Sequence, residues 1–133
     1  MFREDFVWGV ASSAYQVEGT DAADGRGACV WDMFAADGRV FEHQNAGTSC
    51  DHMHHYKEDI ALMKHLGIRA YRFPLNWARI LPEGTGRVNE KAIAMYRDMI
   101  LTMKENGITP YLTLFHWEFP QALYAVSYTH LTL

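Results

Sequence analysis

The sequence predicts an α/β fold: the N-terminal part, about three β/α units, of a (β/α)8 TIM barrel. A helix-and-strand pattern recurs after forty residues, polar and aromatic side chains follow each predicted strand, and no Gly-x-Gly-x-x-Gly loop follows the first strand. The recurrence predicts parallel strands joined by helices. The other two observations favour a barrel over a doubly wound nucleotide-binding sheet.

The internal repeat carries most of this prediction. A shift of forty residues aligns the following pairs: Met63 with Met103, Gly67 with Gly107, Tyr71 with Tyr111, and Trp77 with Trp117. In both copies a helix closes on glycine and a buried strand leads to a tryptophan. Preceded by one more strand, the copies make β-α-β-α-β, whose right-handed crossovers place the strands parallel. A complete barrel takes about 250 residues, so we expect these 133 residues to be a fragment.

The first half of the chain predicts two strands and one long helix. Residues 6–10 form a short apolar run that predicts the first strand, and residues 19–47 predict a long, partly packed loop. Over residues 51–66 apolar side chains recur at helical spacing, and Gly67 is expected to end that helix. Residues 68–75 predict the second strand.

The second half predicts another helix and another strand. Asn89 is expected to cap a helix that ends at Asn106 and Gly107. Residues 109–120 predict a strand covered on both faces, ending in three polar and aromatic side chains: His116, Trp117 and Glu118. Because α/β folds build their sites where parallel strands end, this is the best-placed candidate site in the sequence.

Composition and charge exclude several classes of protein. A content of 49% hydrophobic and 14% aromatic residues predicts one globular domain. The net charge of −4, from 12 basic and 16 acidic residues, provides no basic surface for nucleic acid. We find no signal-peptide pattern and no apolar run near the ~20 residues that span a bilayer, so we expect a soluble, cytoplasmic protein without a membrane partner. Cys29 and Cys50 are expected to be free thiols, and the oligomeric state is left open.

A series of spaced motifs carries a family resemblance from about Phe6 to Tyr124. Its most specific part is Phe6-x-Trp8-Gly9-x-Ala11-x-Ser13-Ala14-Tyr15-Gln16-x-Glu18-Gly19. Others follow in order: Arg26-Gly27, Val30-Trp31-Asp32, Cys50-Asp51-His52, Tyr56-Lys57-Glu58-Asp59, Tyr71-Arg72-Phe73, Trp77-x-Arg79-Ile80-Leu81-Pro82, Gly107-Ile108-x-Pro110, and His116-Trp117-x-x-Pro120-Gln121-Ala122-Leu123. Together they resemble the family 1 glycoside hydrolases, which include the β-glucosidases.

The resemblance implies a TIM-barrel enzyme of carbohydrate metabolism that hydrolyses β-linked glucosides or galactosides with retention. Its substrate would be a small β-glucoside or oligosaccharide, and no cofactor is expected. Retention requires two carboxyl groups about 5–5.5 Å apart, which the family takes from an Asn-Glu-Pro motif after the fourth strand and a Glu-Asn-Gly motif after the seventh. Here Glu90 precedes Lys91, and Glu105 ends a helix before the third strand. We therefore expect no catalytic residue in this chain, and no activity from it alone.

The resemblance does supply residues that would bind the sugar. Gln16 matches a glutamine that hydrogen-bonds sugar hydroxyls, His116 matches a histidine that binds a neighbouring hydroxyl, and Trp117 would form an apolar wall. Arg72 matches an arginine beside the nucleophile, where its charge would favour the ionised carboxylate. Without the resemblance, the ordinary interpretations are a loop amide for Gln16, an ion-pair partner for Arg72 and aromatic packing for Trp117.

Two other groups of residues were considered as sites. One group is Asp51 with His52, His54 and His55. Two histidines plus a carboxylate, without further ligands, are too few and too locally clustered for a metal, so we expect none there and assign these residues to capping and the start of a helix. Glu18 and Glu118 both follow strands, but neither matches the family's catalytic carboxylates, and Glu118 takes a position usually held by aspartate.

The final residues depart from the family pattern. We expect a partial family 1 domain over residues 1–124, followed by a tail over residues 125–133 that resembles translated adapter sequence and is interpreted as a library artefact. Two alternatives for the function stay open. One is a 6-phospho-β-glycosidase fragment, and the other is a non-catalytic sugar-binding module.

Overall fold

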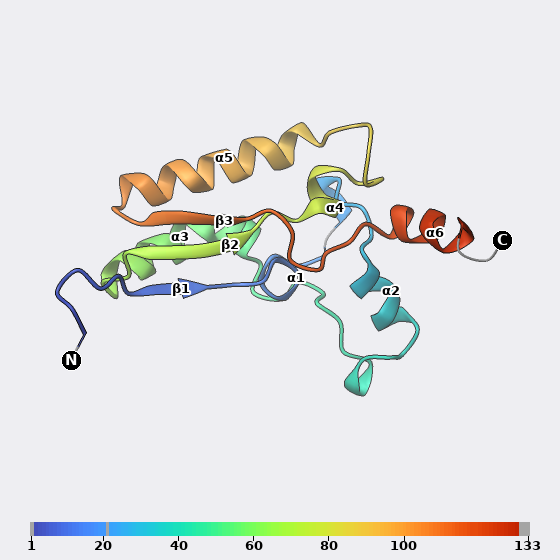
Figure 1. Cartoon of the computed structure of the whole chain (residues 1–133), viewed down its shortest axis with the longest axis horizontal. Coiled ribbons are helices and arrows are strands. Elements are labelled where there is room, and N and C mark those ends of the chain that lie inside the picture. The colour runs from blue at the N-terminus through green and yellow to red at the C-terminus, as the bar shows by residue number, and fades with distance from the viewer. Residues whose placement is uncertain (1, 21, 131–133) are drawn as a thin grey trace.

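The computed structural model describes residues 2–20 and 22–130 and contains a three-stranded parallel sheet. The strands are β1 (Gly9–Ala11), β2 (Ala70–Pro74) and β3 (Thr109–Thr113), in the spatial order β1-β2-β3 (Figure 1). Both neighbouring pairs are parallel, which confirms the predicted β-α-β-α-β arrangement.

The strand order places β2 between the other two strands. Ala70 pairs with Gly9 on one side and with Thr109 on the other. Successive side chains of a strand point to opposite faces. Tyr71 and Phe73 belong to the hydrophobic core, so Arg72 between them lies on the other face of the sheet.

Two long helices cover the core face of the sheet (Figure 1). They are α3 (His52–His65) and α5 (Glu90–Glu105), and each lies within one residue of its predicted bounds. Gly67 follows α3 with φ +75°, the left-handed conformation expected of a residue that ends a helix. The Asn89 side chain accepts a hydrogen bond from Ala92 N at 3.4 Å, which confirms the predicted N-cap of α5.

The buried core joins these helices to β2 and to the start of β3. Its buried members come from α3, β2 and α5, with one residue just before β3: Met53, Ile60, Tyr71, Phe73, Tyr96, Met99, Met103 and Ile108. Burial of their apolar surface, at about 25 cal/mol per Å², is the main force that holds the helices on the sheet.

Short elements lie beyond the carboxyl ends of the strands (Figure 1). They are four helices and two 3-10 turns: α1 (Ala14–Val17), α2 (Val30–Ala36), α4 (Trp77–Ile80), α6 (Gln121–His130), η1 (Ala22–Asp24) and η2 (Phe41–His43). The stretch predicted as one long loop thus contains α2. The helix α6 continues across residue 124, where we expected the family resemblance to stop.

Two predictions about the strands were wrong. The first strand was expected over residues 6–10, but β1 begins at Gly9, because Phe6 N bonds to Arg3 O in a turn and the ring of Phe6 packs on the ring of Trp8. The third strand was expected to be covered on both faces. Instead Tyr111 is 54% exposed, because it pairs with Arg72 on the face of the sheet opposite the helices, which is open. Across residues 2–20 and 22–130, we find no helix with the length and apolar character needed to cross a bilayer.

Candidate functional site

The predicted sugar-binding residues lie on segments that meet at one edge of the sheet. Gln16 is on α1, directly after β1, and Arg72 is within β2. His116 and Trp117 follow the end of β3. Because the three strands are parallel, these segments share the carboxyl-end edge, where α/β folds bind ligands.

Gln16 is presented by a helix of only four residues. Its side chain is exposed, while its backbone carbonyl accepts a hydrogen bond from the Ser49 hydroxyl. The amide is therefore available at the surface, where it can donate and accept hydrogen bonds at once.

Arg72 is half-buried on the open face of the sheet. Its Nε donates a 2.8 Å hydrogen bond to Thr113 Oγ1 at the end of β3. This bond orients the guanidinium group and leaves its other N–H groups to act on a neighbouring anion. Thr113 was missed in the sequence, because its contact with Arg72 depends on the pairing of β2 with β3.

His116 and Trp117 stand on a tight turn after β3. Trp117 has φ +78°, and Phe119 N donates to Trp117 O at 2.8 Å. The Trp117 side chain is 67% exposed, which suits a wall against which an apolar sugar face can lie. His116 is half-buried, and its Nδ1 has no hydrogen-bond partner within residues 2–20 and 22–130.

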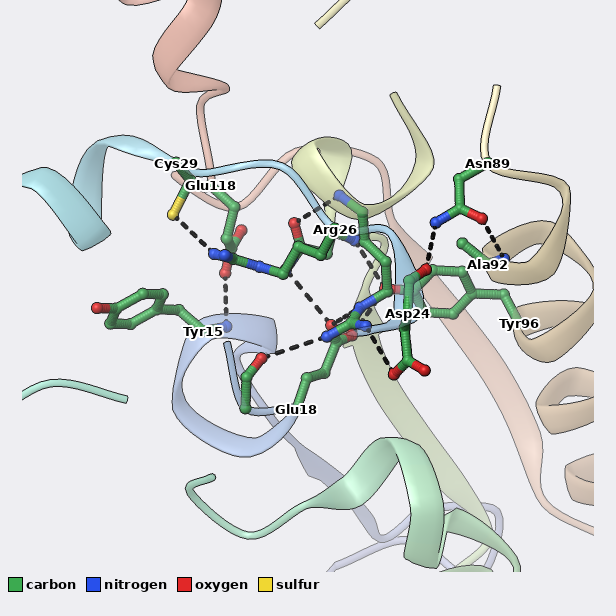
Figure 2. A network of polar contacts seen from close by, with 12 residues as sticks. Tyr15, Glu18, Asp24, Arg26, Cys29, Asn89, Ala92, Tyr96 and Glu118 are labelled. Carbon is green, nitrogen blue, oxygen red and sulfur yellow. Dashed lines mark hydrogen bonds and ion pairs between the residues drawn. The ribbon is translucent and has the colours of Figure 1, made fainter. Parts of the chain in front are cut away.

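A buried polar network lies beneath α1 (Figure 2). The Glu18 carboxylate accepts hydrogen bonds from Arg79 Nε at 3.2 Å and from Tyr96 OH at 2.8 Å. A longer one, at 3.4 Å, comes from Asn76 Nδ2. Arg79 also donates to Gly19 O at 3.2 Å. The network ties the end of α1 to α4 and α5 and so fixes the position of the helix that presents Gln16.

The network changes the acidity of its members. Burial raises the pKa of Glu18, and the nearby Arg79 guanidinium opposes that rise. Burial, together with the negative charge of Glu18, raises the pKa of Tyr96 well above its ordinary value. Both groups are bonded to protein partners and lie away from the surface, so we assign them a structural role.

The histidines near the start of α3 each lie close to at least one carboxylate, and Asp51 lies close to both His54 and His55. His52 Nδ1 lies 2.6 Å from Asp59 Oδ2, and His54 Nδ1 lies 2.6 Å from Asp51 Oδ1. Asp51 occupies the N-cap position, but its side chain makes no capping hydrogen bond, so the capping role predicted for it was wrong. Within the described ranges, 2–20 and 22–130, no three His, Cys, Asp or Glu side chains form a metal-binding group.

Comparison with known proteins identifies relatives over nearly the whole chain. The model of glycosyl hydrolase family 1 matches residues 1–127. β-Glucosidase A of Acetivibrio thermocellus is 46% identical over 123 residues, which cover 92% of this chain and 28% of that protein. An aryl-phospho-β-D-glucosidase of Bacillus subtilis is also 46% identical over 123 residues, which cover 92% of this chain and 26% of that protein.

This chain also resembles a solved structure in three dimensions. The β-glucosidase from Thermotoga maritima in complex with azafagomine matches with a TM-score of 0.90 and 46% identity, over 95% of this chain and 29% of that one. The chain therefore spans less than a third of the length of these relatives.

Proposed function

This chain belongs to glycosyl hydrolase family 1, and on that premise we propose that it is part of a retaining β-glycosidase that hydrolyses terminal β-D-glucosides. Its fold is that of the N-terminal part of the family's TIM barrel. The observation that supports the proposal best is the order of the parallel strands, which places Gln16 shortly after β1, Arg72 within β2 and the His116–Trp117 turn shortly after β3.

Each of these side chains suits one part of glycoside binding. The exposed Gln16 amide and the His116 ring would hydrogen-bond adjacent hydroxyls of the sugar. Trp117 would cover an apolar face of the ring. Arg72, held by Thr113, would place its positive charge beside the nucleophilic carboxylate and keep that group ionised.

The chemistry itself requires two carboxyl groups, a nucleophile and an acid/base. No glutamate of this chain stands in the family's two catalytic motifs, since Glu90 precedes Lys91 and Glu105 ends α5 before β3. Glu18 is buried and hydrogen-bonded to Arg79, and Glu118 is buried with its Oε1 hydrogen-bonded to Tyr15 N. We therefore propose that the chain binds the sugar but does not cleave the glycosidic bond by itself.

A binding and turnover experiment tests this proposal. The purified chain is titrated with D-glucose while tryptophan fluorescence is recorded, and is then incubated with 4-nitrophenyl β-D-glucoside. We expect a saturable glucose signal that Gln16→Ala weakens at least tenfold and that Gln44→Ala, another exposed glutamine, leaves unchanged. We expect no release of nitrophenol. Turnover would contradict the proposed inactivity, and the lack of any glucose signal would contradict sugar binding by this chain.

The relative in Bacillus subtilis supports a second candidate. It is an aryl-phospho-β-D-glucosidase and is as similar to this chain as the Acetivibrio β-glucosidase. The experiment that separates the two uses protein from the full downstream reading frame with phosphorylated and unphosphorylated aryl glucosides. A strong preference for the 6-phosphate would favour the phospho-glycosidase. Glucose binding without turnover by that longer protein would favour the non-catalytic sugar-binding module.

A further inference from the structure

Glu118 links the two segments that would contact the sugar. It directly follows Trp117 and is 1% exposed. Its Oε1 accepts a hydrogen bond from the backbone N–H of Tyr15 at 3.1 Å (Figure 2). Tyr15 directly precedes Gln16 on α1. A single carboxylate therefore joins the turn that carries Trp117 to the helix that carries Gln16.

This hydrogen bond takes the place of a missing helix cap. Ser13 stands at the N-cap position of α1 in an extended conformation, but its side chain makes no capping hydrogen bond. The first N–H groups of a helix have no acceptor within the helix. Glu118 supplies one to Tyr15, so the loop after β3 determines where α1 begins.

The other side of the loop is held by backbone hydrogen bonds. Val30 N donates to Phe119 O, and Gln121 N donates to Ala28 O, both at 2.9 Å. These bonds fasten the loop after Glu118 to the first residue of α2 and to Ala28 just before it. They do not reach α1, to which Glu118 makes the side-chain connection.

Two further observations favour a positioning role over simple packing. Trp117 has φ +78°, a strained conformation for a non-glycine residue that persists only where the surroundings hold it. Glu118 is the buried residue next to it. A buried carboxylate is also costly to remove from water, so a position that needed only volume would be better filled by an apolar side chain.

We propose that Glu118 is a positioning residue that holds the Tyr15 N–H and so fixes Gln16 relative to His116 and Trp117. The three side chains can then reach the same sugar. This inference rests on the proposed function, because it takes those three residues as the sugar contacts. Glu118 itself touches protein groups and is not a catalytic residue.

The structural part of the test uses the full 133-residue chain and two substitutions. Glu118→Gln keeps an acceptor oxygen, whereas Glu118→Met fills a similar volume without one. We expect Glu118→Met to speed hydrogen exchange of the Tyr15 amide at least tenfold and to shift the NMR signals of Gln16 and Trp117. Glu118→Gln should stay within twofold of the wild type, as should Glu105→Met, which changes an exposed glutamate at the far end of α5.

Three outcomes would refute the positioning role of Glu118. If the Tyr15 amide of Glu118→Met exchanges at the wild-type rate, that result refutes the positioning role. So does an equal loss in Glu118→Gln and Glu118→Met. If Glu118→Met does not fold, the wild-type chain decides: a nuclear Overhauser contact between the Glu118 side chain and the Tyr15 amide is expected, and its lack refutes the link.

A glucose titration separates this inference from the proposed function. Glu118→Met should weaken the glucose-induced shift of the Trp117 indole signal at least tenfold, and Glu118→Gln should restore it. Equal responses in the wild type and Glu118→Met would refute positioning. A wild-type chain that does not respond to glucose would refute the proposed sugar binding, while Tyr15 exchange would still decide whether Glu118 holds α1.

Discussion

At the residue scale, the Arg79–Glu18 pair differs from the surface ion pairs of this chain. Its two side chains are 2% and 4% exposed, whereas those of Arg3 and Asp5 are 86% and 68% exposed. An exposed pair contributes about 0–1 kcal/mol to stability. Removing one partner of a buried pair costs more, because the remaining charge stays buried without compensation.

The first prediction concerns this buried pair. Arg79→Met leaves the Glu18 carboxylate without its cation and should lower the free energy of unfolding by about 3–5 kcal/mol, measured by urea denaturation. Arg39→Met, at a side chain that is 61% exposed, should cost less than about 1 kcal/mol. If the buried, unpaired carboxylate of Glu18 is the cause, adding Glu18→Met to Arg79→Met should recover part of the lost free energy of unfolding. If the double variant instead loses as much free energy of unfolding as Arg79→Met and Glu18→Met lose in sum, this explanation is contradicted.

The second prediction concerns pH. The pKa of Tyr96 lies well above its ordinary value of 10.0, chiefly through burial and then through the charge of Glu18. The unfolded chain therefore loses this proton at a lower pH than the folded chain does. The free energy of unfolding should fall as the pH rises above about 10, by up to ~1.4 kcal/mol per pH unit for this proton. Tyr96→Phe should make that decline shallower by a similar amount in urea titrations at successive alkaline pH values, and an unchanged slope would refute the assignment.

At the element scale, the long elements were predictable and the short ones were not. The bounds of α3 and α5 follow from apolar spacing and end signals that lie within each helix. α2 was missed because it is short and depends on outside contacts. The N–H of its first residue, Val30, donates a 2.9 Å hydrogen bond to Phe119 O in the loop after β3. β1 was placed too early because an apolar run such as residues 6–10 packs equally well in a turn.

The sequence proposes members of the site, whose role in sugar binding stays a prediction, but it did not predict their contacts with the rest of the protein. The resemblance located Gln16, Arg72, His116 and Trp117, whose segments the parallel sheet brings to one edge. Their supports come from distant parts of the chain: Thr113 for Arg72, and Arg79 for Glu18 beneath α1. Such partners depend on strand register and loop path, which local sequence does not encode.

A third prediction tests the start of α5. The Asn89 side chain caps the helix and also donates a 2.8 Å hydrogen bond to Asp24 O in η1. Asn89→Ala removes both contacts and should cost about 1–2 kcal/mol in urea denaturation. Asn89→Ser can keep the cap without the second contact, so it should lose less. If Asn89→Ala and Asn89→Ser lose the same free energy of unfolding, the bond with Asp24 accounts for the whole loss and the cap contributes nothing.

At the scale of the whole molecule, both edges of the sheet are open. Among the residues that the structure describes, β1 and β3 each pair only with β2. Large apolar side chains are exposed in and after β3: Tyr111 at 54%, Leu114 at 78% and Phe115 at 46%. Open strand edges with apolar side chains favour association with other chains. The chain matches 29% of the length of a solved β-glucosidase, and within residues 2–20 and 22–130 its sheet has three strands.

The fourth prediction follows from these edges. The purified chain should self-associate as its concentration rises, and Tyr111→Lys should shift the equilibrium toward monomer, because a charge on an edge strand opposes pairing. Sedimentation velocity over a range of concentrations measures this. Phe41→Lys, which changes a residue that is 76% exposed on η2, is the matched control and should have little effect. A chain that remains monomeric throughout would show that its edges do not pair.

The register of β2 also has a consequence for the order of folding. Ala70 pairs with Thr109 across α5 and with Gly9 across the longer segment that contains α2 and α3. Closing the shorter connection loses less chain entropy, so we expect the β2–α5–β3 unit to form before β1 joins it. Arg72 and the His116–Trp117 turn would then take their places early, and Gln16 would arrive last, with the strand that precedes it.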